Sequence, residues 1–253
     1  MADATTIPTL LELAPGRFGQ DILPAEEKLF RAAENGDWAD WREESGAKGL
    51  IRSDRLSWLC TDSNAGSRVT YRGVSIVGAQ IDGELNLEWA KISFPLQAHM
   101  CVFKEAIILE NSQLVTLILL DTSIKDLRAR NVVVERSVFL RAGFKAERAV
   151  DFEGATIGGN LECDGGQFNF KGEAPALDAN GVKVEGSVLL RTGFKAEGEV
   201  NFAAAYVARH FQWCLVQSPE NSILDLRFTR VGTLLNDQTS RLTAGKLHID
   251  GFV

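Results

Sequence analysis

The sequence predicts a mainly β protein: a parallel β-helix, in which short strands wind into stacked coils, with a small α-helical cap at its N-terminal end. Positions equivalent to Ile81 return in steps of 10 or 11 along the chain, at Ile92, Phe103, Leu114, Ile124 and Val134. The segments 137–147 and 187–197 also share the pattern Ser-Val-x-Leu-Arg-x-Gly-Phe-Lys-Ala-Glu. Repeats of fixed spacing are typical of solenoids, in which each unit buries its apolar side only by stacking on its neighbours.

The composition is that of a folded soluble protein. Of the 253 residues, 45% are hydrophobic and 24% are charged, and the sequence has no apolar run of about 18 residues that could cross a membrane. The N-terminus lacks the basic start and apolar stretch of a secretion signal, so we expect a cytoplasmic protein. The four cysteines lie far apart without a Cys-x-x-Cys pair, and we interpret them as reduced core residues: Cys60, Cys101, Cys163 and Cys214.

The net charge of −7 is unevenly divided along the chain. Residues 1–64 hold 7 Lys/Arg and 12 Asp/Glu, a net charge of −5, whereas residues 65–253 hold 20 and 22, a net charge of −2. A nucleic-acid groove needs clustered positive charge, so we do not expect nucleic acid as a partner. The near neutrality of the repeats also argues against a rod that imitates the charge of DNA.

We expect residues 1–64 to form an α-helical N-terminal arm and cap, and residues 65–253 to form the solenoid. Proline at the start, acids in the first turn and Gly36 past the end predict a helix over residues 24–35. A second helix is predicted from Arg55 to about Cys60, with Ser53 or Asp54 as its N-cap. Its inward residues are expected to be Leu56, Trp58 and Leu59.

The remaining N-terminal segments show weaker helix signals. Residues 1–20 predict a docking arm with at most a short turn of helix at 10–13, and residues 61–68 a turn-rich joint. Trp38 and Trp41 follow the first helix at helical spacing, so we expect them to continue its apolar face after a break. Together with Trp58 they are expected to pack on the first coil, which would otherwise expose its apolar interior.

Within the solenoid, short strands of about three residues alternate with tight corners. Two steps are expected to close one coil of about 20 to 22 residues, so that the strands stack as parallel sheets. Leu-x-Leu pairs such as 85–87 point inward, and residues 169–175 form an inserted loop. No C-terminal cap is visible. Corners are expected at Ala79, Ala90 and Ala155, and glycine's backbone freedom is expected to be needed at Gly83, Gly159 and Gly186.

Several segments of the sequence resemble those of a known family. They lie at residues 56–62, 78–87, 143–147, 154–163, 230–236 and 247–252. The repeat step itself resembles that of pentapeptide-repeat proteins and related right-handed β-helices, although the strict Ala-Asp/Asn-Leu-x-x unit is not kept. Over residues 24–253 the segments look like a bacterial family of β-helical proteins often labelled membrane-associated oxidoreductase. The resemblance implies a right-handed β-helix, and longer members that continue into a helical region and in some cases membrane helices.

The sequence indicates no catalytic, cofactor-binding or metal-binding residues. The glycine-rich segment 154–159 lies inside the repeat, without a following helix to bind a pyrophosphate, so the oxidoreductase label has no visible chemical basis. The repeat step does not fit the six-residue frame of left-handed β-helix acyltransferases, and the three histidines are isolated: His99, His210 and His248. A polysaccharide enzyme would need clustered carboxylates. Its candidates, which otherwise form a solvated face, are Glu84, Glu88, Arg141, Glu162 and Asp164.

Two sets of residues are candidates for an interaction surface. If the duplicated segments stack directly, they form charged ladders of Arg141 with Arg191, Lys145 with Lys195 and Glu147 with Glu197. The alternative is that these charges only keep a corner soluble. An uncapped last coil would offer apolar residues to another protein or a second subunit, namely Leu226, Leu235, Leu247, Ile249 and Phe252.

The sequence therefore favours a non-enzymatic scaffold or protein–protein interaction module. Rigid stacked coils present long flat faces for recognition without moving parts. One alternative is a DNA-mimic inhibitor of a topoisomerase, known among pentapeptide-repeat proteins and weakened here by the −2 charge of the repeats. The other is an enzyme acting on a polysaccharide or small molecule at a coil face, with residues 169–175 as a wall of its cleft.

Overall fold

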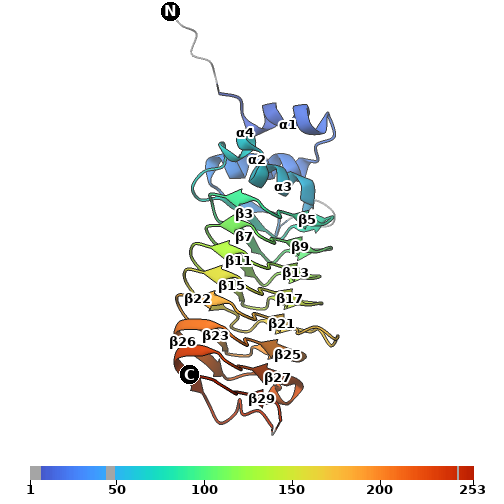
Figure 1. Ribbon diagram of the computed structural model, residues 1–253. Helices are drawn as coiled ribbons and strands as arrows, with labels where there is room; N and C mark the ends of the chain where they lie inside the picture. Colours follow the sequence, from blue (N-terminus) through green and yellow to red (C-terminus); the bar gives the residue numbers. More distant parts are fainter. Residues whose placement is uncertain (1–6, 44–48, 244) are drawn as a thin grey trace, which may run out of the picture.

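The fold is a parallel β-solenoid of about eight turns with small helices at its N-terminal end (Figure 1). The structure is a computed structural model that describes residues 7–43, 49–243 and 245–253. The predicted fold class is confirmed. No helix in the described ranges is long and apolar enough to cross a membrane.

Each coil has four sides. The chain passes through β3 (Val74–Val77), β4 (Gln80–Asp82), β5 (Leu85–Asn86) and β6 (Lys91–Ile92), and then starts the next coil with β7 (Leu96–His99). We call these sides faces 1 to 4. Val74 pairs with Leu96, and Leu96 with Leu117, so each coil takes up two of the repeat steps seen in the sequence. The prediction that two steps close one coil is therefore confirmed.

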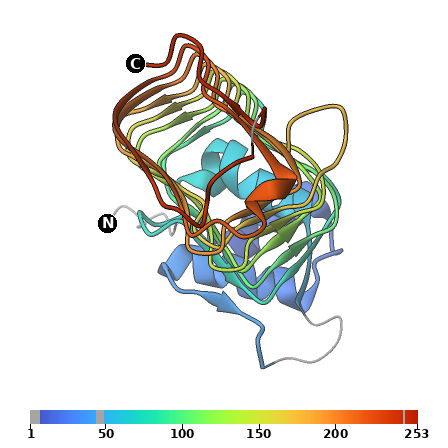
Figure 2. The same ribbon diagram turned by 90° about the horizontal axis from the view of Figure 1, so that it is seen from below.

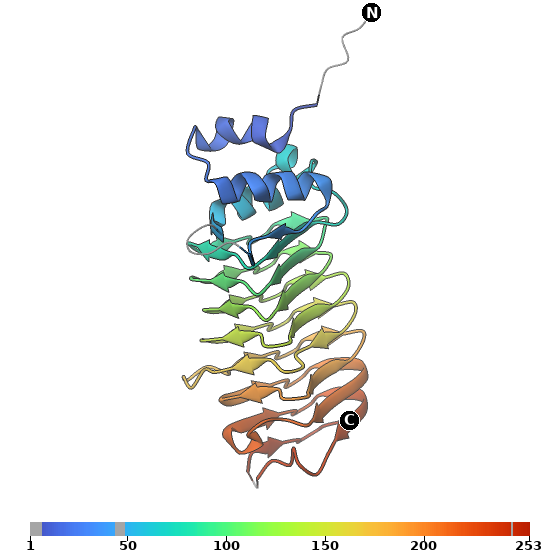
Figure 3. The same ribbon diagram turned by 180° about the vertical axis from the view of Figure 1, so that it is seen from behind.

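The strands on each face stack in parallel (Figures 1 and 3). Face 1 continues with β11 (Leu117–Leu120), β15 (Val138–Arg141), β19 (Leu161–Glu162) and β23 (Val188–Arg191), and β1 (Ala39–Asp40) precedes it. Face 4 continues with β10 (Gln113–Leu114), β14 (Val133–Val134), β18 (Thr156–Ile157) and β22 (Lys183–Val184). The long strands β26 (Tyr206–Cys214) and β28 (Arg230–Asn236) run through faces 4 and 1 and join them.

Faces 2 and 3 form separate sheets. Face 2 contains β2 (Leu50–Arg52), β4, β8 (Val102–Phe103), β12 (Ser123–Ile124), β16 (Lys145–Ala146), β20 (Gln167–Phe168) and β24 (Lys195–Ala196). Face 3 contains β5, β9 (Ile107–Ile108), β13 (Leu127–Arg128), β17 (Val150–Asp151), β21 (Leu177–Asp178), β25 (Gly198–Asn201), β27 (Ser222–Asp225) and β29 (Leu247–His248). The predicted loop at 169–175 leaves the stack between β20 and β21 (Figure 2).

Side chains of equivalent positions stack in rows along the solenoid. On face 1, one inward row runs through Val74, Leu96, Leu117, Val138, Leu161, Val188 and Phe211; all are buried except Leu96, which is partly buried. Cys60, Cys101 and Cys163 are buried thiols as predicted, whereas Cys214 is only half-buried. Burial raises the pKa of Cys60 to about 12 and of Cys101 to about 11.

In each coil, the corner between faces 1 and 2 needs the left-handed backbone conformation. The corner between faces 1 and 2 uses Gly78, Met100, Asp121, Ala142, Gly165, Thr192 and Leu215, all with positive φ. Gly83 also has a positive φ of 89°, as predicted. For Gly159 and Gly186 the prediction is wrong, because they are not among the positive-φ residues and are needed for space. A Cβ on Gly186 would lie 2.6 Å from the carbonyl oxygen of Gly159 in the preceding coil.

The N-terminal cap consists of α1 (Leu10–Phe18), α2 (Pro24–Asn35), α3 (Ser53–Thr61) and α4 (Ser63–Gly66). These helices lie over the first coil (Figures 1 and 3). The prediction for α2 is confirmed to the residue. The prediction of at most a short helical turn within residues 1–20 is wrong. Thr9 forms a capping box with Glu12 and is the N-cap of a nine-residue helix. The N-cap of α3 is Arg52 rather than Ser53 or Asp54, and the joint at 61–68 contains α4.

The tryptophans of the cap divide into two kinds. Trp41 and Trp58 are buried, and Trp58 packs edge-on between Phe18 and Phe30 at ring-centroid distances of 5.4 and 5.3 Å. The expected helical face through Trp38 and Trp41 is wrong, because Ala39 and Asp40 between them form β1 and pair with β3. Trp38 consequently lies outside the core. Since β1 and β2 already belong to the stacked sheets, the first strands of the solenoid precede residue 65.

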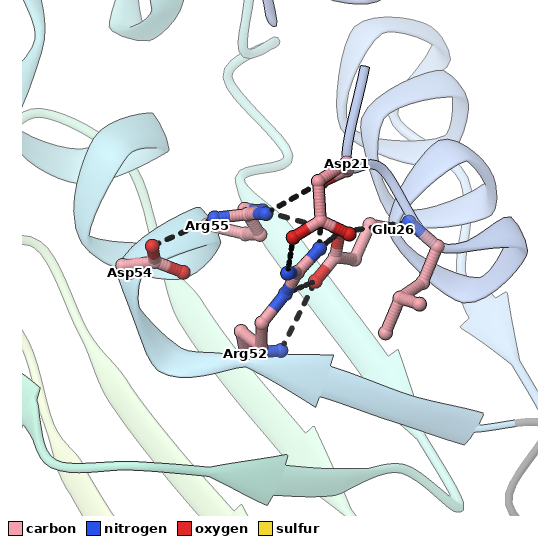
Figure 4. Close-up of polar contacts among 6 residues, drawn as sticks. Asp21, Glu26, Arg52, Asp54 and Arg55 are labelled. Atoms are coloured by element: carbon pink, nitrogen blue, oxygen red, sulfur yellow. Dashed lines mark hydrogen bonds and ion pairs between the residues drawn. The ribbon is translucent and has the colours of Figure 1, made fainter. Parts of the chain in front are cut away.

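A buried ion-pair network ties the cap together (Figure 4). The carboxylate of Glu26, on α2, is fully buried and accepts hydrogen bonds from Arg52 Nε at 2.8 Å and Arg55 Nε at 3.1 Å. Arg52 also binds Asp21, and Arg55 binds Asp54 at 2.7 Å. Burial acts to raise the pKa of Glu26, but the hydrogen bonds from Arg52 and from backbone amides outweigh it and lower the pKa.

Candidate interaction surfaces

The two duplicated segments do not lie in adjacent coils. Arg141 ends β15 and Arg191 ends β23, and β19 of the intervening coil pairs with both strands. Lys145 and Lys195 are likewise separated by Gln167. The expectation of direct ladders is therefore wrong, because the duplication extends over two coils rather than one.

The intervening coil supplies the opposite charges. Arg141 Nη1 lies 2.8 Å from Glu162 Oε2, and Arg191 Nε lies 3.0 Å from Asp164 Oδ2. Arg191 also donates a hydrogen bond to Gln212 in the following coil. Partial burial raises the pKa of Asp164, and Arg191 only partly offsets this effect. The predicted like-charge ladder is thus an alternating row of ion pairs on the outside of face 1.

The two repeated glutamates have different surroundings. Glu197 is nearly buried and forms ion pairs with Lys195 at 2.7 Å and with Lys171 of the inserted loop. These lysines lower the pKa of Glu197 to about 2. Glu147 is exposed. The sequence repeat hides this difference, because Lys171 lies in the inserted loop of the intervening coil, and the coil before Glu147 has no such loop.

The C-terminal end presents part of the predicted apolar set. Leu235, Leu247 and Ile249 are 40%, 40% and 49% exposed, whereas Leu226 is fully buried in the preceding coil. Phe252 is partly buried against the core. Leu226 therefore cannot belong to an exposed surface, and the other four residues lie at or near the end.

A loop partly covers this end, contrary to the expectation of an open coil. The indole nitrogen of Trp213 donates a hydrogen bond of 2.8 Å to the carbonyl of Ser240, and Leu242 packs against the core. Asp237 accepts hydrogen bonds from the Leu215 amide and from Thr239 and Ser240. These bonds lower the pKa of Asp237 to about 2. The loop crosses part of the end seen in Figure 2.

A surface that the sequence analysis missed lies on the outside of face 1. Ile118 pairs with Phe139 in one outer row, and Leu120 follows His99 in the other. All four side chains are only partly buried, and Arg141 lies over the Phe139 ring at 5.0 Å. We call Ile118, Leu120 and Phe139 the outer strip. The run Leu117-Ile-Leu-Leu120 was its signal in the sequence, because a strand with apolar residues on both sides leaves every second one outside.

A cleft of about 460 Å³ adjoins the outer strip at its cap-side end. His99 and Leu120 lie in its wall, and Trp38 and Met100 line it as well. The rings of Trp38 and His99 are 4.7 Å apart. The cleft therefore combines exposed aromatic and thioether surface with the polar groups of the neighbouring corner.

The structure brings only part of the enzyme candidates together, because Arg141 pairs with Glu162 but the five residues do not form one site. Glu84 and Glu88 flank β5 on face 3 near the cap, whereas Glu162 and Asp164 lie several coils away on face 1 and pair with arginines. Among the described residues, no three His, Cys, Asp or Glu side chains are grouped so that they could hold a metal ion.

The fold places the chain in the class of parallel β-solenoid proteins. Comparison with protein-family models, with curated proteins and with solved structures found no match for any part of the chain.

Proposed function

We propose that the protein is a non-enzymatic scaffold that binds another protein through the outside of face 1. The observation that supports this is the outer strip, in which apolar side chains of neighbouring coils point away from the core. Contiguous apolar surface on the outside of a folded domain is a frequent mark of a protein-binding site. Strands fixed on both sides by parallel neighbours also make this face rigid, so little ordering entropy is lost on binding.

The surroundings of the strip suit a protein partner. Trp38 and Met100 continue the apolar surface towards the cap, and the ion pairs of Arg141 and Arg191 border it on the other side. An apolar centre with a polar rim is the usual arrangement of an interface, and Trp and Met are enriched in such centres.

We place the protein in the cytoplasm. The repeat step supports the assignment of the solenoid to the pentapeptide-repeat-like, right-handed class.

The last coil is a second contact surface in this proposal. Leu247 lies in β29, the last strand of face 3, and Ile249 follows it on the same coil. Another protein or a second copy of this chain could cover these side chains and pair with the strand edge. The loop at 237–243 limits such a contact to the part of the end that it leaves uncovered.

Binding to variant baits tests which surface acts. The baits are the wild-type chain, the strip variant Ile118→Gln/Phe139→Gln and the end variant Leu247→Gln/Ile249→Gln. The control is Val102→Gln/Val133→Gln, which changes two exposed valines on faces 2 and 4. Each bait is incubated with an extract of the native host after nuclease treatment, and any retained protein is purified and titrated against all four baits.

The proposal expects a purified partner that binds the wild-type and control baits equally and the strip variant at least tenfold more weakly. Loss only with the end variant would move the interface to the last coil. A topoisomerase bound equally by all baits would instead favour the DNA-mimic alternative. Failure of every retained protein to bind in purified form would overturn the scaffold function and make a glycan screen the next step.

A further inference from the structure

We propose that the cleft at the cap-side end of the outer strip receives an arginine side chain of the partner protein. This inference rests on the proposed function, because the cleft and the strip share Leu120 and would be covered by the same partner. It adds the chemistry by which that partner is recognised.

The walls of the cleft come from two distant parts of the chain. Trp38, Asp40 and Arg42 belong to β1 and its flanks, whereas His99, Met100 and Asp121 belong to β7, β11 and the corners that follow them. Trp38 is 45% exposed and Met100 is 52% exposed. The cleft thus contains a flat aromatic ring, a flexible thioether and two carboxylates.

Asp40, Arg42 and Asp121 line the cleft and leave an excess of one negative charge there, and Lys28 lies near Asp40 outside the lining. Asp40 and Arg42 form a forked ion pair, with both carboxylate oxygens 3.0 Å from Arg42 Nε. Hydrogen bonds from the Arg42 side chain and backbone lower the pKa of Asp40 to about 2, so the pair is ionised and neutral as a whole. Asp121 is exposed and forms no ion pair within the described ranges. Its carboxylate favours a cationic ligand, as does the overall charge of −7.

His99 offers a further polar contact. Its Nε2 is shielded from solvent and has no hydrogen-bond partner in the described part of the chain. Burial lowers the pKa of His99, which favours the neutral ring. With the proton on Nδ1, Nε2 is an acceptor for an N–H group. A buried polar atom without a partner is costly, and a donor from a ligand would remove that cost.

These features together fit a guanidinium group better than an ammonium or an apolar side chain. A guanidinium is planar and stacks on an indole, and its five N–H donors are enough to bond both a carboxylate and a ring nitrogen. A lysine would supply the charge without the planar stacking. An apolar side chain would leave both the carboxylate and Nε2 without partners.

The test uses N-acetyl-arginine methylamide as the probe, with the lysine and norleucine analogues for comparison. Binding to the isotope-labelled full chain is followed by nuclear magnetic resonance at the Trp38 indole N–H and the His99 ring. The variants are Asp121→Asn and Trp38→Leu, and Asp82→Asn is the control because Asp82 is an exposed carboxylate on face 2.

The expected result is a saturable shift of both signals with the arginine probe. Asp121→Asn should weaken binding about tenfold, as expected for loss of one charge-assisted hydrogen bond, and Asp82→Asn should not change it. Trp38→Leu should also weaken binding, read from the His99 signal. Equal binding of the norleucine probe, an unchanged affinity of Asp121→Asn, or no shift of either signal would overturn the proposal.

The two proposals fail in different ways. If a partner binds through the outer strip but the arginine probe shifts neither signal, the cleft assignment is wrong and the scaffold function stands. If the probe binds as expected and no purified partner is sensitive to the strip variant, the cleft assignment stands and the scaffold function fails.

Discussion

Glu26 on α2 and Arg52 at the end of β2 form an ion pair of 2.8 Å whose acid is fully buried. The same carboxylate caps the start of α2 by accepting a hydrogen bond of 3.0 Å from the Leu23 amide. One side chain therefore joins the cap helices to the first strand of face 2. This makes the cap part of the solenoid rather than an appendage.

Glu26→Gln should lower the free energy of unfolding by about 3–5 kcal/mol, because it leaves the two arginines without their buried counter-charge. Chemical denaturation measures this loss. The matched control is Glu27→Gln, one residue further on the exposed side of α2, which should change stability by less than about 0.5 kcal/mol. Equal effects of the two variants would show that the network contributes nothing specific.

The ion pair of Glu26 and Arg52 also makes the stability of the fold depend on pH, in a direction that the pKa shift defines. The pKa of Glu26 is lowered from its ordinary value of 4.5, so the pair stabilises the fold fully above that pH. The contribution is lost as the pH falls below 4.5 through the lower pKa of the folded state. Acid unfolding of Glu26→Gln should lack this component, so its stability should fall less steeply than that of the wild type below pH 4.5.

Gly186→Ala should destabilise the protein by about 1–3 kcal/mol, because the added Cβ has no room between coils. It would lie 2.2 Å from Asn160 Oδ1, which accepts a hydrogen bond from the Ser187 amide. Thermal unfolding of the variant measures the effect.

Gly16→Ala is the opposite control. Gly16 lies within α1, and nothing stands within 4 Å of its added Cβ. Alanine there should stabilise the protein by about 0.5–1 kcal/mol through its higher helix propensity. A loss of stability in both variants would contradict the packing argument for Gly186.

Ala98→Val should stabilise the protein by about 0.5–1 kcal/mol, because it adds apolar volume next to an unfilled space. Ala98 faces an apolar internal cavity of about 40 Å³ beneath α3, also lined by Leu56 and Cys60. Its neighbours in the inward row are the larger Ile76 and Leu119. Filling such a space regains apolar contacts.

Ala196→Val controls for the added volume. Ala196 is fully buried and stacks on Phe168. The same change there should destabilise by about 1–3 kcal/mol through overpacking. Chemical denaturation compares the two variants, and a destabilised Ala98→Val would show that the cavity cannot accept two methyl groups.

The sequence predicted the coil well and the surfaces poorly. The regular repeat step predicted where Ile81 and its equivalents turn inward, because the need to stack constrains every coil alike. The helix at 24–35 was predicted to the residue, because its proline, its acids and Gly36 are local signals.

The errors have a common physical origin. Stacking between coils depends on how the chain closes each turn, and the match between segments 137–147 and 187–197 does not reveal that Glu162 and Asp164 lie between Arg141 and Arg191. The cleft was missed because Trp38 meets His99 only through the pairing of β1 with β3. The wrong helical assignment around Trp38 hid that pairing.

Asp237→Ala should loosen the loop that covers part of the C-terminal end, because the Leu215 and Ser240 amides lose their acceptor. Hydrogen exchange should become faster at these two amides and remain unchanged at the Val150 amide in the middle of the stack. Unchanged exchange at Leu215 would contradict this role of Asp237.

Acid should also loosen this loop, as Asp237→Ala does. The pKa of Asp237 is lowered from 3.8 to about 2, so its stabilising contribution is complete above pH 3.8 and is lost as the pH falls towards 2. The wild-type loop should therefore approach the exchange behaviour of the alanine variant in that range.

The two copies of the duplicated segment lie two coils apart, with a coil of complementary charge between them. Successive coils lie about 4.8 Å apart, so a pair of coils adds about 10 Å to the rod. Gain or loss of such a pair would keep the sequence of charges intact and leave both the cap-side cleft and the far end unaltered. Changes in the length of the solenoid by whole pairs of coils would therefore alter the distance between the cap and the far end in steps of about 10 Å.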